Sequence, residues 1–330
     1  MTEMMQAVWY ETQGAAQDVL VSGELPIPTP EPGEVLVRLH ASGVNPSDVK
    51  VRAGSRPMAF SRIIPHSDGA GVVEAVGAGG DPALVGARVF VRNGQWQRAH
   101  GTAAQFITLD AGCVHQLPDS VGFEVGAALG IPALTAAYAV LKDGPVDGET
   151  LLIHGGGGTV ARLAVQIAVD SGATVIATTG NMARADRIGD AGAVAVLDYQ
   201  SPDLVGAVRA AAGGAEISRI IDPECGVNIE ANIDLLAAKG TIVGFGSVKQ
   251  PSVDLPFLKM MFKNITLSSI LVYLLAAEEA AAYAAIVGDM LERGVLDVPV
   301  QDTLPLAQAA RAHQLVEAGN RSGAVLLATG

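Results

Sequence analysis

The chain has 330 residues, of which 49% are apolar and 17% are charged, so it can bury a large core over one or two domains and is not disordered. Its 21 lysines and arginines against 34 aspartates and glutamates give a net charge of −13, and no basic cluster offsets this charge. A nucleic-acid-binding surface is therefore not expected. The two cysteines, Cys113 and Cys225, are too few for a disulfide framework or a four-thiolate zinc site.

Neither a secretion signal nor a membrane segment is expected. The first residues lack a basic region followed by an apolar stretch. The most apolar tract, residues 265–287, is interrupted by Glu278 and Glu279 and is too short to span a bilayer. The sequence therefore predicts a soluble, cytoplasmic protein.

The first 120 residues predict a β-rich region with frequent turns. A proline-rich loop over residues 26–33 is followed by expected strands at 34–39, 69–77 and 88–91. No long segment with helical periodicity occurs before about residue 122.

From residue 122 onward, the pattern changes to alternating strands and helices. Short apolar runs predict strands at 151–153, 174–177, 194–197, 217–221 and 241–245. Helical stretches separate them, which indicates βαβ crossovers and a doubly wound parallel sheet of the Rossmann type. The last 60 residues predict helices at 276–293 and 306–317 and strands at 297–300 and 324–327, and this tail is expected to return to the N-terminal region. The expected architecture is a Rossmann domain, residues 125–266, inserted into a β-rich domain formed by residues 1–124 and 267–330.

A glycine-rich segment, residues 153–161, joins the first strand of the Rossmann domain to its first helix. Gly155, Gly158 and Ala161 have a spacing suited to the pyrophosphate of a dinucleotide, which needs close approach of the backbone and free N–H groups at a helix N-terminus. His154 precedes the loop and is expected to support it. The alternative is a glycine turn that binds no ligand.

The end of the next strand indicates which dinucleotide is bound. NAD sites place a carboxylate there, whereas this chain has Thr179, Gly180 and Asn181, with Arg184 close behind. Because a carboxylate would repel a 2′-phosphate and a guanidinium would attract it, the segment favours NADPH. The alternative for Arg184 is a solvated helix residue.

Taken together, these motifs resemble the zinc-free quinone oxidoreductase (ζ-crystallin-like) branch of the medium-chain dehydrogenase/reductase superfamily. The resemblance covers nearly the full length and is carried by segments 43–48, 65–77, 134–136, 154–161 and 243–246. It implies a GroES-like catalytic domain split around the Rossmann domain, assembly as a homodimer and hydride transfer from NADPH to a small-molecule acceptor. Residues 265–275 would then be either an edge strand that pairs across the dimer or an ordinary core strand.

The resemblance also implies roles for individual residues around the cofactor. Asn45 would lie near the nicotinamide, and Thr135 would lie beside the nicotinamide half of the cofactor. Gly158, Thr159 and Val160 would hold the pyrophosphate, and Arg184 and Tyr199 would reach the adenosine phosphate. Phe245 and Gly246 would line the nicotinamide side.

No metal site is expected. Zinc-dependent relatives of this family have a cysteine at the position of Asn45 and a histidine at the position of Ser67. His66 is one residue away from that position, which on an extended backbone turns its side chain to the other face. The segment that carries four structural cysteines in those relatives has only Cys113 here.

Without a metal, an acceptor must be activated by hydrogen-bond donors and by its alignment with the cofactor. Asn45 is expected to position or donate to the acceptor, and Asp48 is a catalytic candidate or an acceptor that fixes the loop. Lys50 is either a donor to a developing enolate or a surface lysine. The function expected is an NADPH-dependent, zinc-independent reductase of quinones or related conjugated carbonyls. The alternatives are a C=C reductase of enones, alkenals or acrylates, and a non-catalytic NADPH sensor.

Overall fold

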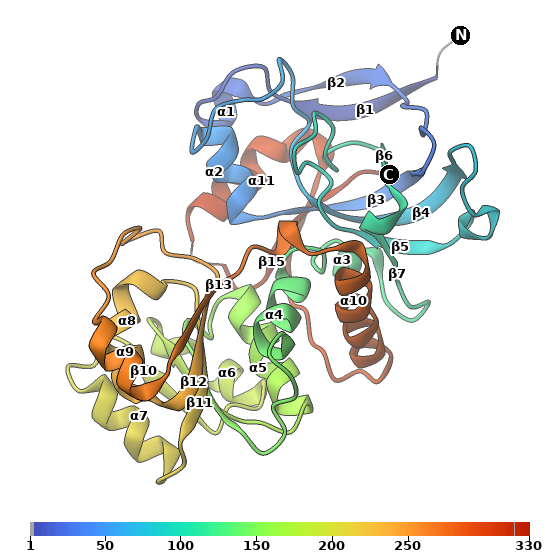
Figure 1. Ribbon diagram of the computed structural model, residues 1–330. Coiled ribbons are helices and arrows are strands. Elements are labelled where there is room, and N and C mark those ends of the chain that lie inside the picture. Colours follow the sequence, from blue (N-terminus) through green and yellow to red (C-terminus); the bar gives the residue numbers. More distant parts are fainter. Residues whose placement is uncertain (1–2, 320) are drawn as a thin grey trace. The chain divides into compact units, whose positions relative to one another are not determined.

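The chain folds into two compact units, each of which is described by itself (Figure 1). The structure is a computed structural model that describes residues 3–319 and 321–330. Unit 1 comprises Met1–Leu134, Leu275–Gly294 and Val298–Gly330, and unit 2 comprises Thr135–Leu274 and Val295–Asp297. The predicted boundaries, after residues 124 and 266, lie earlier in the chain. A division after residue 266 would cut strand β13 (Thr266–Ser269), which is hydrogen-bonded to its neighbour β12 within unit 2.

Unit 2 is built on a parallel sheet, six-stranded in the described residues, with the order β10-β9-β8-β11-β12-β13. Its first strand lies in the middle and the order reverses beside it, as in doubly wound folds, so the predicted Rossmann architecture is confirmed. The strands are β8 (Thr150–Ile153), β9 (Thr174–Thr179), β10 (Ala195–Asp198), β11 (Ile217–Asp222), β12 (Leu236–Gly244) and β13.

Helices cover both faces of this sheet (Figure 1). They are α4 (Pro132–Leu141, which begins in unit 1), α5 (Thr159–Asp170), α6 (Ala185–Asp190), α7 (Leu204–Ala212), α8 (Cys225–Leu235) and α9 (Phe257–Lys263). The core on one face combines Val208 of α7, Ile229 of α8 and Met260 of α9 with sheet residues such as Leu152 and Ile220. Burial of these aliphatic side chains stabilises the unit by about 25 cal/mol per Å² of apolar area removed from water.

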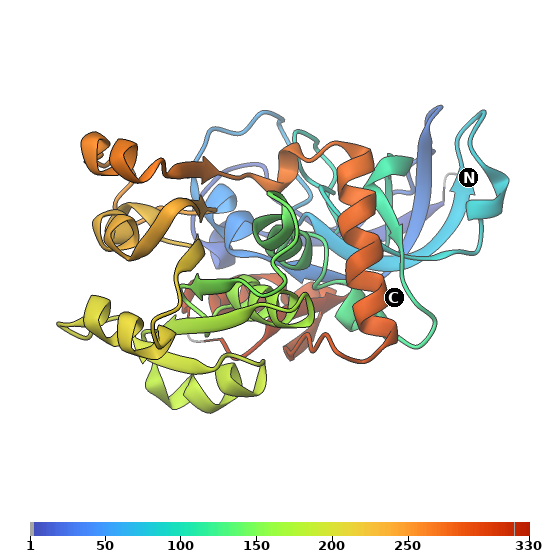
Figure 2. The same ribbon diagram turned by 60° about the horizontal axis from the view of Figure 1, so that its bottom comes forward.

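Unit 1 is built mainly on a seven-stranded sheet, counted over the described residues, with the order β14-β15-β3-β4-β5-β7 and with β6 paired to β3. Its strands are β3 (Glu34–Val44), β4 (Asp68–Val76), β5 (Arg88–Val91), β6 (Phe106–Asp110), β7 (Val114–Gln116), β14 (Val300–Pro305) and β15 (Ala324–Ala328). A separate hairpin-like pair consists of β1 (Met4–Trp9) and β2 (Val21–Pro26). The helices are α1 (Ala16–Val19), α2 (Pro46–Ala53), α3 (Phe123–Gly126), α10 (Ala277–Glu292) and α11 (Ala309–Glu317). Figure 2 shows the full length of α10 (orange).

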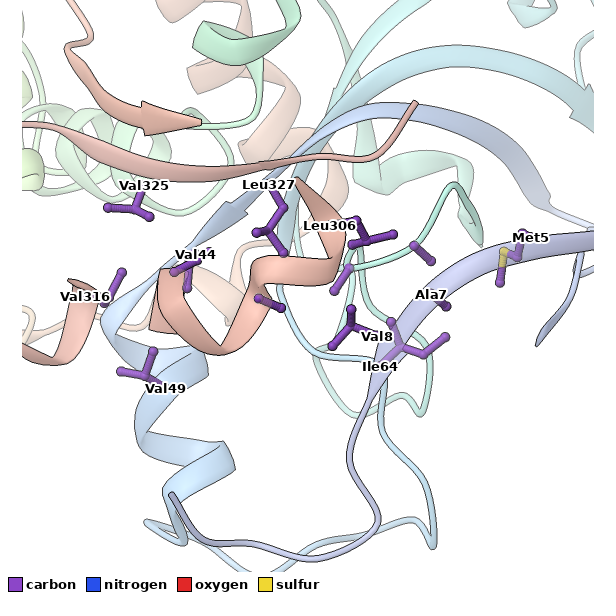
Figure 3. Packing of buried hydrophobic residues seen from close by; sticks show 14 residues of the cluster. Met5, Ala7, Val8, Val44, Val49, Ile64, Leu306, Val316, Val325 and Leu327 are labelled. Carbon is purple, nitrogen blue, oxygen red and sulfur yellow. The ribbon is translucent and has the colours of Figure 1, made fainter. Parts of the chain in front are cut away.

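The C-terminal tail returns to the N-terminal region, as predicted. Strand β15 pairs antiparallel with β3, placing Val325 opposite Val44. Helix α11 packs Val316 into the cluster that contains Val49 of α2 and Leu327 of β15 (Figure 3). This core therefore holds α2, which carries Asp48 and Lys50, between segments from both ends of the chain.

Two predicted elements of unit 1 differ from the structure. Helix α2 lies where no helix was expected, because Pro46 at its first turn and the left-handed Gly54 at its end define a helix too short to show periodicity. The strand predicted at 297–300 starts at Val300 instead, because its hydrogen-bonding partner β15 begins at Ala324 opposite Val300.

No helix in the described residues is long and apolar enough to cross a membrane.

Candidate functional site

The glycine loop joins β8 to α5 in unit 2, as the sequence predicts. Gly155 has φ 69°, a left-handed conformation that favours glycine, and a Cβ there would lie 3.0 Å from the Pro223 ring. Gly158 is the N-cap of α5, and no side chain caps the helix. The N–H groups at Thr159 and Val160 therefore begin a twelve-residue helix whose N-terminus is suited to an anion.

His154, at the start of the glycine loop, is held by hydrogen bonds from both ring nitrogens, in agreement with its predicted supporting role. Its Nδ1 lies 2.9 Å from Thr178 Oγ1, and its Nε2 lies 2.8 Å from Asn232 Oδ1. Asn232 in turn donates to Asp222 Oδ2 at 2.7 Å. This buried chain of hydrogen bonds links the carboxyl ends of β8, β9 and β11, and it fixes the edge from which the loop projects.

The residues after β9 gather beside the loop. Asn181 N donates to Thr179 Oγ1 at 3.2 Å, and Asn181 Oδ1 accepts from Ala183 N at 3.1 Å, which turns the chain sharply. Arg184 Nη1 donates to the Gly157 carbonyl at 3.3 Å. A Cβ at Gly157 would lie 3.3 Å from both Arg184 Cδ and Thr179 Oγ1, so a side chain there would crowd both residues.

Tyr199 follows β10 and lies against Gly180. A Cβ at Gly180 would approach Tyr199 Cε1 to 2.4 Å, and the Tyr199 side chain is 39% exposed. Next to this ring is a cavity of about 100 Å³ lined by His154, Gly155, Thr178, Tyr199, Pro223, Glu224, Val227, Asn228 and Lys249. The open glycine backbone, the uncapped helix and this cavity together suit a dinucleotide.

Three predicted cofactor residues of unit 2, Thr135, Phe245 and Gly246, do not line the cavity beside Tyr199. Phe245 and Gly246 follow β12 and line a second cavity of about 320 Å³, together with Cys225, Val253 and Ser269. Gly246 is required by close backbone packing, because a Cβ there would lie 2.4 Å from the Pro223 carbonyl. Thr135 is buried in α4.

In unit 1, Asn45 is held by two carboxyl groups. Its main-chain N–H donates to Asp48 Oδ2 at 2.7 Å, and its side-chain Nδ2 donates to Asp68 Oδ2, also at 2.7 Å. Asn45, Asp48 and Asp68 are all buried. Asn45 is the N-cap of α2, so Asp48 in the first turn fixes the start of that helix.

Both carboxyl groups resist ionisation. Burial raises the pKa of Asp48 to about 7, although hydrogen bonds from the main chain of Asn45 and Ser67 and the charge of Arg56 oppose the shift. Burial also raises the pKa of Asp68 well above its ordinary value; the hydrogen bond from Asn45 opposes this shift, and the nearby Asp48 charge adds to it. Two buried carboxyl groups around one asparagine therefore disfavour the doubly ionised state.

Sequence reasoning placed Asp48 and Asn45 together but did not assign Asp68. Asp68 lies in segment 65–77, which carries the family resemblance, but its place beside Asn45 follows from the pairing of β4 with β3, where Asp68 lies opposite Gly43. Lys50, in contrast, is exposed on α2.

Ser67, which stands where the zinc-dependent relatives have a histidine, directly precedes Asp68 in the chain. Ser67 is buried, and His66 has φ 79° and points into the core, where its Nε2 lies 2.8 Å from His313 Nε2. His66 Nδ1 lies 2.9 Å from Ser42 Oγ. Within residues 3–319 and 321–330 no group of three or more His, Cys, Asp or Glu side chains could hold a metal ion. Zinc-independence remains a prediction.

Comparison with known proteins supports the relationship expected from the motifs. Residues 31–119 match the model of the alcohol dehydrogenase GroES-like domain, and residues 159–287 match the model described as zinc-binding dehydrogenase. A quinone oxidoreductase of Salmonella typhimurium is 30% identical over 94% of this chain and 95% of its own length.

Solved structures agree. A mycobacterial quinone oxidoreductase has a TM-score of 0.90 at 32% identity, covering 98% of this chain and 99% of its own. The Escherichia coli quinone oxidoreductase, solved in complex with NADPH, has a TM-score of 0.86 at 26% identity, with coverage of 98% and 99%. The chain therefore belongs to the quinone oxidoreductase branch of the medium-chain dehydrogenase/reductase superfamily.

Proposed function

We propose that this protein is an NADPH-dependent, zinc-independent reductase that transfers hydride to quinones or related conjugated carbonyl compounds. The observation that carries the proposal is the segment after β9, where Arg184 donates a hydrogen bond to the glycine loop. At the end of this strand, where NAD sites have a carboxylate, the chain has Thr179, Gly180 and Asn181. The names of the full-length relatives and the NADPH complex of the Escherichia coli structure support the same assignment.

The cofactor would be held mainly by unit 2. Gly155, Gly158, Thr159 and Val160 offer open backbone to the pyrophosphate, and Thr179, Gly180, Asn181, Arg184 and Tyr199 surround the place of the 2′-phosphate. We assign Thr135, Phe245 and Gly246, with Asn45 of unit 1, to the nicotinamide half. When bound, NADPH supplies the hydride, and the protein supplies orientation and electrostatics.

The chemistry of the acceptor is assigned to unit 1. A quinone that takes up a hydride and one proton becomes a hydroquinone, and negative charge builds on an oxygen as the hydride arrives. Asn45 and Lys50 carry N–H donors suited to that charge. Asp48 acts through Asn45, because its carboxyl group holds the Asn45 main chain.

The reaction is tested by following NADPH oxidation with a set of quinones and a set of enones, alkenals and acrylates. The proposal expects the quinones to be the faster acceptors and hydroquinone to be recovered. Saturated carbonyl products formed at a higher rate would instead assign the protein to C=C reduction. Tight NADPH binding without turnover on either set would assign it to a sensor.

We also propose that the protein is a homodimer in the cytoplasm. The edge strand β13 ends the sheet of unit 2, and α9, which directly precedes it in the chain, exposes Phe257, Leu258 and Phe262, the last at 83%. An exposed edge strand next to an apolar patch favours pairing with a second copy. Two free cysteines, Cys113 and Cys225, fit a reducing compartment.

The dimer is tested by sedimentation. Phe262→Glu is expected to shift the protein to monomer, whereas Val85→Glu, at a position 50% exposed in unit 1, leaves it a dimer. A wild-type monomer at micromolar concentration would refute the assembly.

A further inference from the structure

A loop of unit 2 brings the cation of Lys249 to the cavity beside Tyr199. The loop follows β12 and is anchored on Glu224, whose Oε2 accepts hydrogen bonds from Val248 N and Lys249 N, each at 3.0 Å. Ser247 Oγ also accepts from Gly226 N at 2.9 Å. Because Glu224 and Gly226 belong to the start of α8, the backbone of Lys249 is fixed relative to the sheet.

The Lys249 side chain extends over the Tyr199 ring. Its Nζ lies 5.7 Å from the ring centroid, and both residues line the cavity of about 100 Å³ that Gly155 also lines. A cation over a tyrosine face is attracted only weakly when it is exposed to water, so this contact orients the ammonium and leaves its donors free for a stronger partner.

A chain of contacts connects Lys249 to Arg184. Tyr199 touches the position of Gly180, which directly follows Thr179, and Thr179 and Arg184 both border Gly157. Contacts through Tyr199 and Gly180 therefore link Lys249 to the turn after β9 that also carries Arg184, in a protein whose net charge is −13. The Glu224 carboxylate in the same cavity is already engaged by two N–H groups. A dianionic phosphate is the group that this arrangement suits best.

We propose that Lys249 binds the 2′-phosphate of NADPH together with Arg184 and thereby sets the preference for NADPH over NADH. This inference rests on the proposed function, because it assumes that NADPH is the cofactor. Lys249 then acts as a specificity-determining residue supplied by the loop after β12. Arg184 follows β9, so two separate segments contribute to recognition of one phosphate.

The test is isothermal titration calorimetry of the full-length protein with NADPH and with NADH. The variants are Lys249→Gln and Lys249→Arg, and the matched control is Lys259→Gln, which removes the same charge from a lysine paired with Asp234 outside the cavity. Lys249→Gln is expected to weaken NADPH binding about five- to tenfold, since a charge-assisted contact is lost, and to leave NADH binding unchanged. Lys249→Arg is expected to retain most of the affinity.

The outcomes separate the two proposals. If wild type prefers NADPH and Lys249→Gln keeps that preference, the role of Lys249 is refuted and the proposed function stands. Equal weakening of NADPH and NADH would also refute it, because Lys249 would then act on the shared part of the cofactor. A wild type that binds NADH as tightly as NADPH would overturn both.

Discussion

Asn45 Nδ2 donates to Asp68 Oδ2 at 2.7 Å, and Asp68 is 1% exposed. Together with Asp48, which accepts from the Asn45 main chain, it holds one asparagine between two carboxyl groups. Such a cluster is sensitive to pH, because burial opposes the second negative charge. It therefore links a candidate catalytic residue to the stability of unit 1.

The first prediction concerns Asp48. Its pKa is about 7 in the folded protein and 3.8 when solvated, so the folded state binds more protons than the unfolded state between these values. Its contribution to stability is therefore present at low pH and lost as the pH rises through 7. Asp48→Asn should gain on the order of 2–3 kcal/mol relative to wild type between pH 5 and pH 8, measured by urea unfolding. A difference independent of pH would contradict the raised pKa.

The second prediction concerns His66 and His313, which form a buried pair. Burial lowers the pKa of His66 to about 3 and that of His313 well below 6.5. Because only the unfolded state takes up protons below pH 6.5, stability is full above that pH and falls as the solution is acidified. His313→Gln should lose less stability than wild type between pH 6.5 and 4.5, by an amount on the order of 1–2 kcal/mol.

If His313→Gln and wild type lose stability in parallel on acidification, the pair does not cause the acid sensitivity.

The third prediction concerns Gly180. A Cβ at this position would meet Tyr199 Cε1 at 2.4 Å, so Gly180→Ala must displace the ring that borders the cavity of about 100 Å³. NADPH affinity should fall about fivefold or more, while the unfolding free energy changes little because Tyr199 is partly exposed. Gly189→Ala in α6 is the control: outside its chain neighbours and its own helix backbone, no heavy atom lies within 4 Å of the added Cβ, and the substitution should stabilise the protein by about 0.5–1 kcal/mol. Unchanged NADPH affinity in Gly180→Ala would remove Tyr199 from the binding site.

Local elements of this fold could be predicted from the sequence, whereas contacts between distant residues could not. The glycine loop and the strands β8, β9, β10 and β11 are local patterns, so their positions were predicted to within two residues. In contrast, β12 starts five residues before its predicted strand at 241–245, and the predicted domain boundary cut β13. Helix α2 was missed because its eight residues mix charged and β-branched side chains, although Asn45, Pro46 and Asp48 have the pattern of a helix start. The hydrogen bond between His66 and His313 joins residues 247 positions apart. A single sequence holds no local signal for such a pair, and the same applies to Lys249 over Tyr199.

The fourth prediction separates two roles for Lys50. If its ammonium donates to the acceptor oxygen, Lys50→Gln should lower kcat/KM for quinones about tenfold, which is the loss expected for one charge-assisted donor. Binding of NADPH should stay unchanged. Lys142→Gln, which removes a lysine paired with Asp143 in unit 2, is the control for the change in net charge. Turnover within twofold of wild type would make Lys50 a surface residue.

The most direct test of the central claim follows NADPH and NADH oxidation by a benzoquinone side by side, before and after exhaustive dialysis against a strong metal chelator. We predict that kcat/KM is at least about tenfold higher with NADPH, as expected when a cation binds the 2′-phosphate, and that the rate survives chelation. Equal rates with NADH would contradict the assignment of Arg184 to the 2′-phosphate. Activity lost on chelation and restored by zinc would contradict the metal-free role of Asn45 and Ser67.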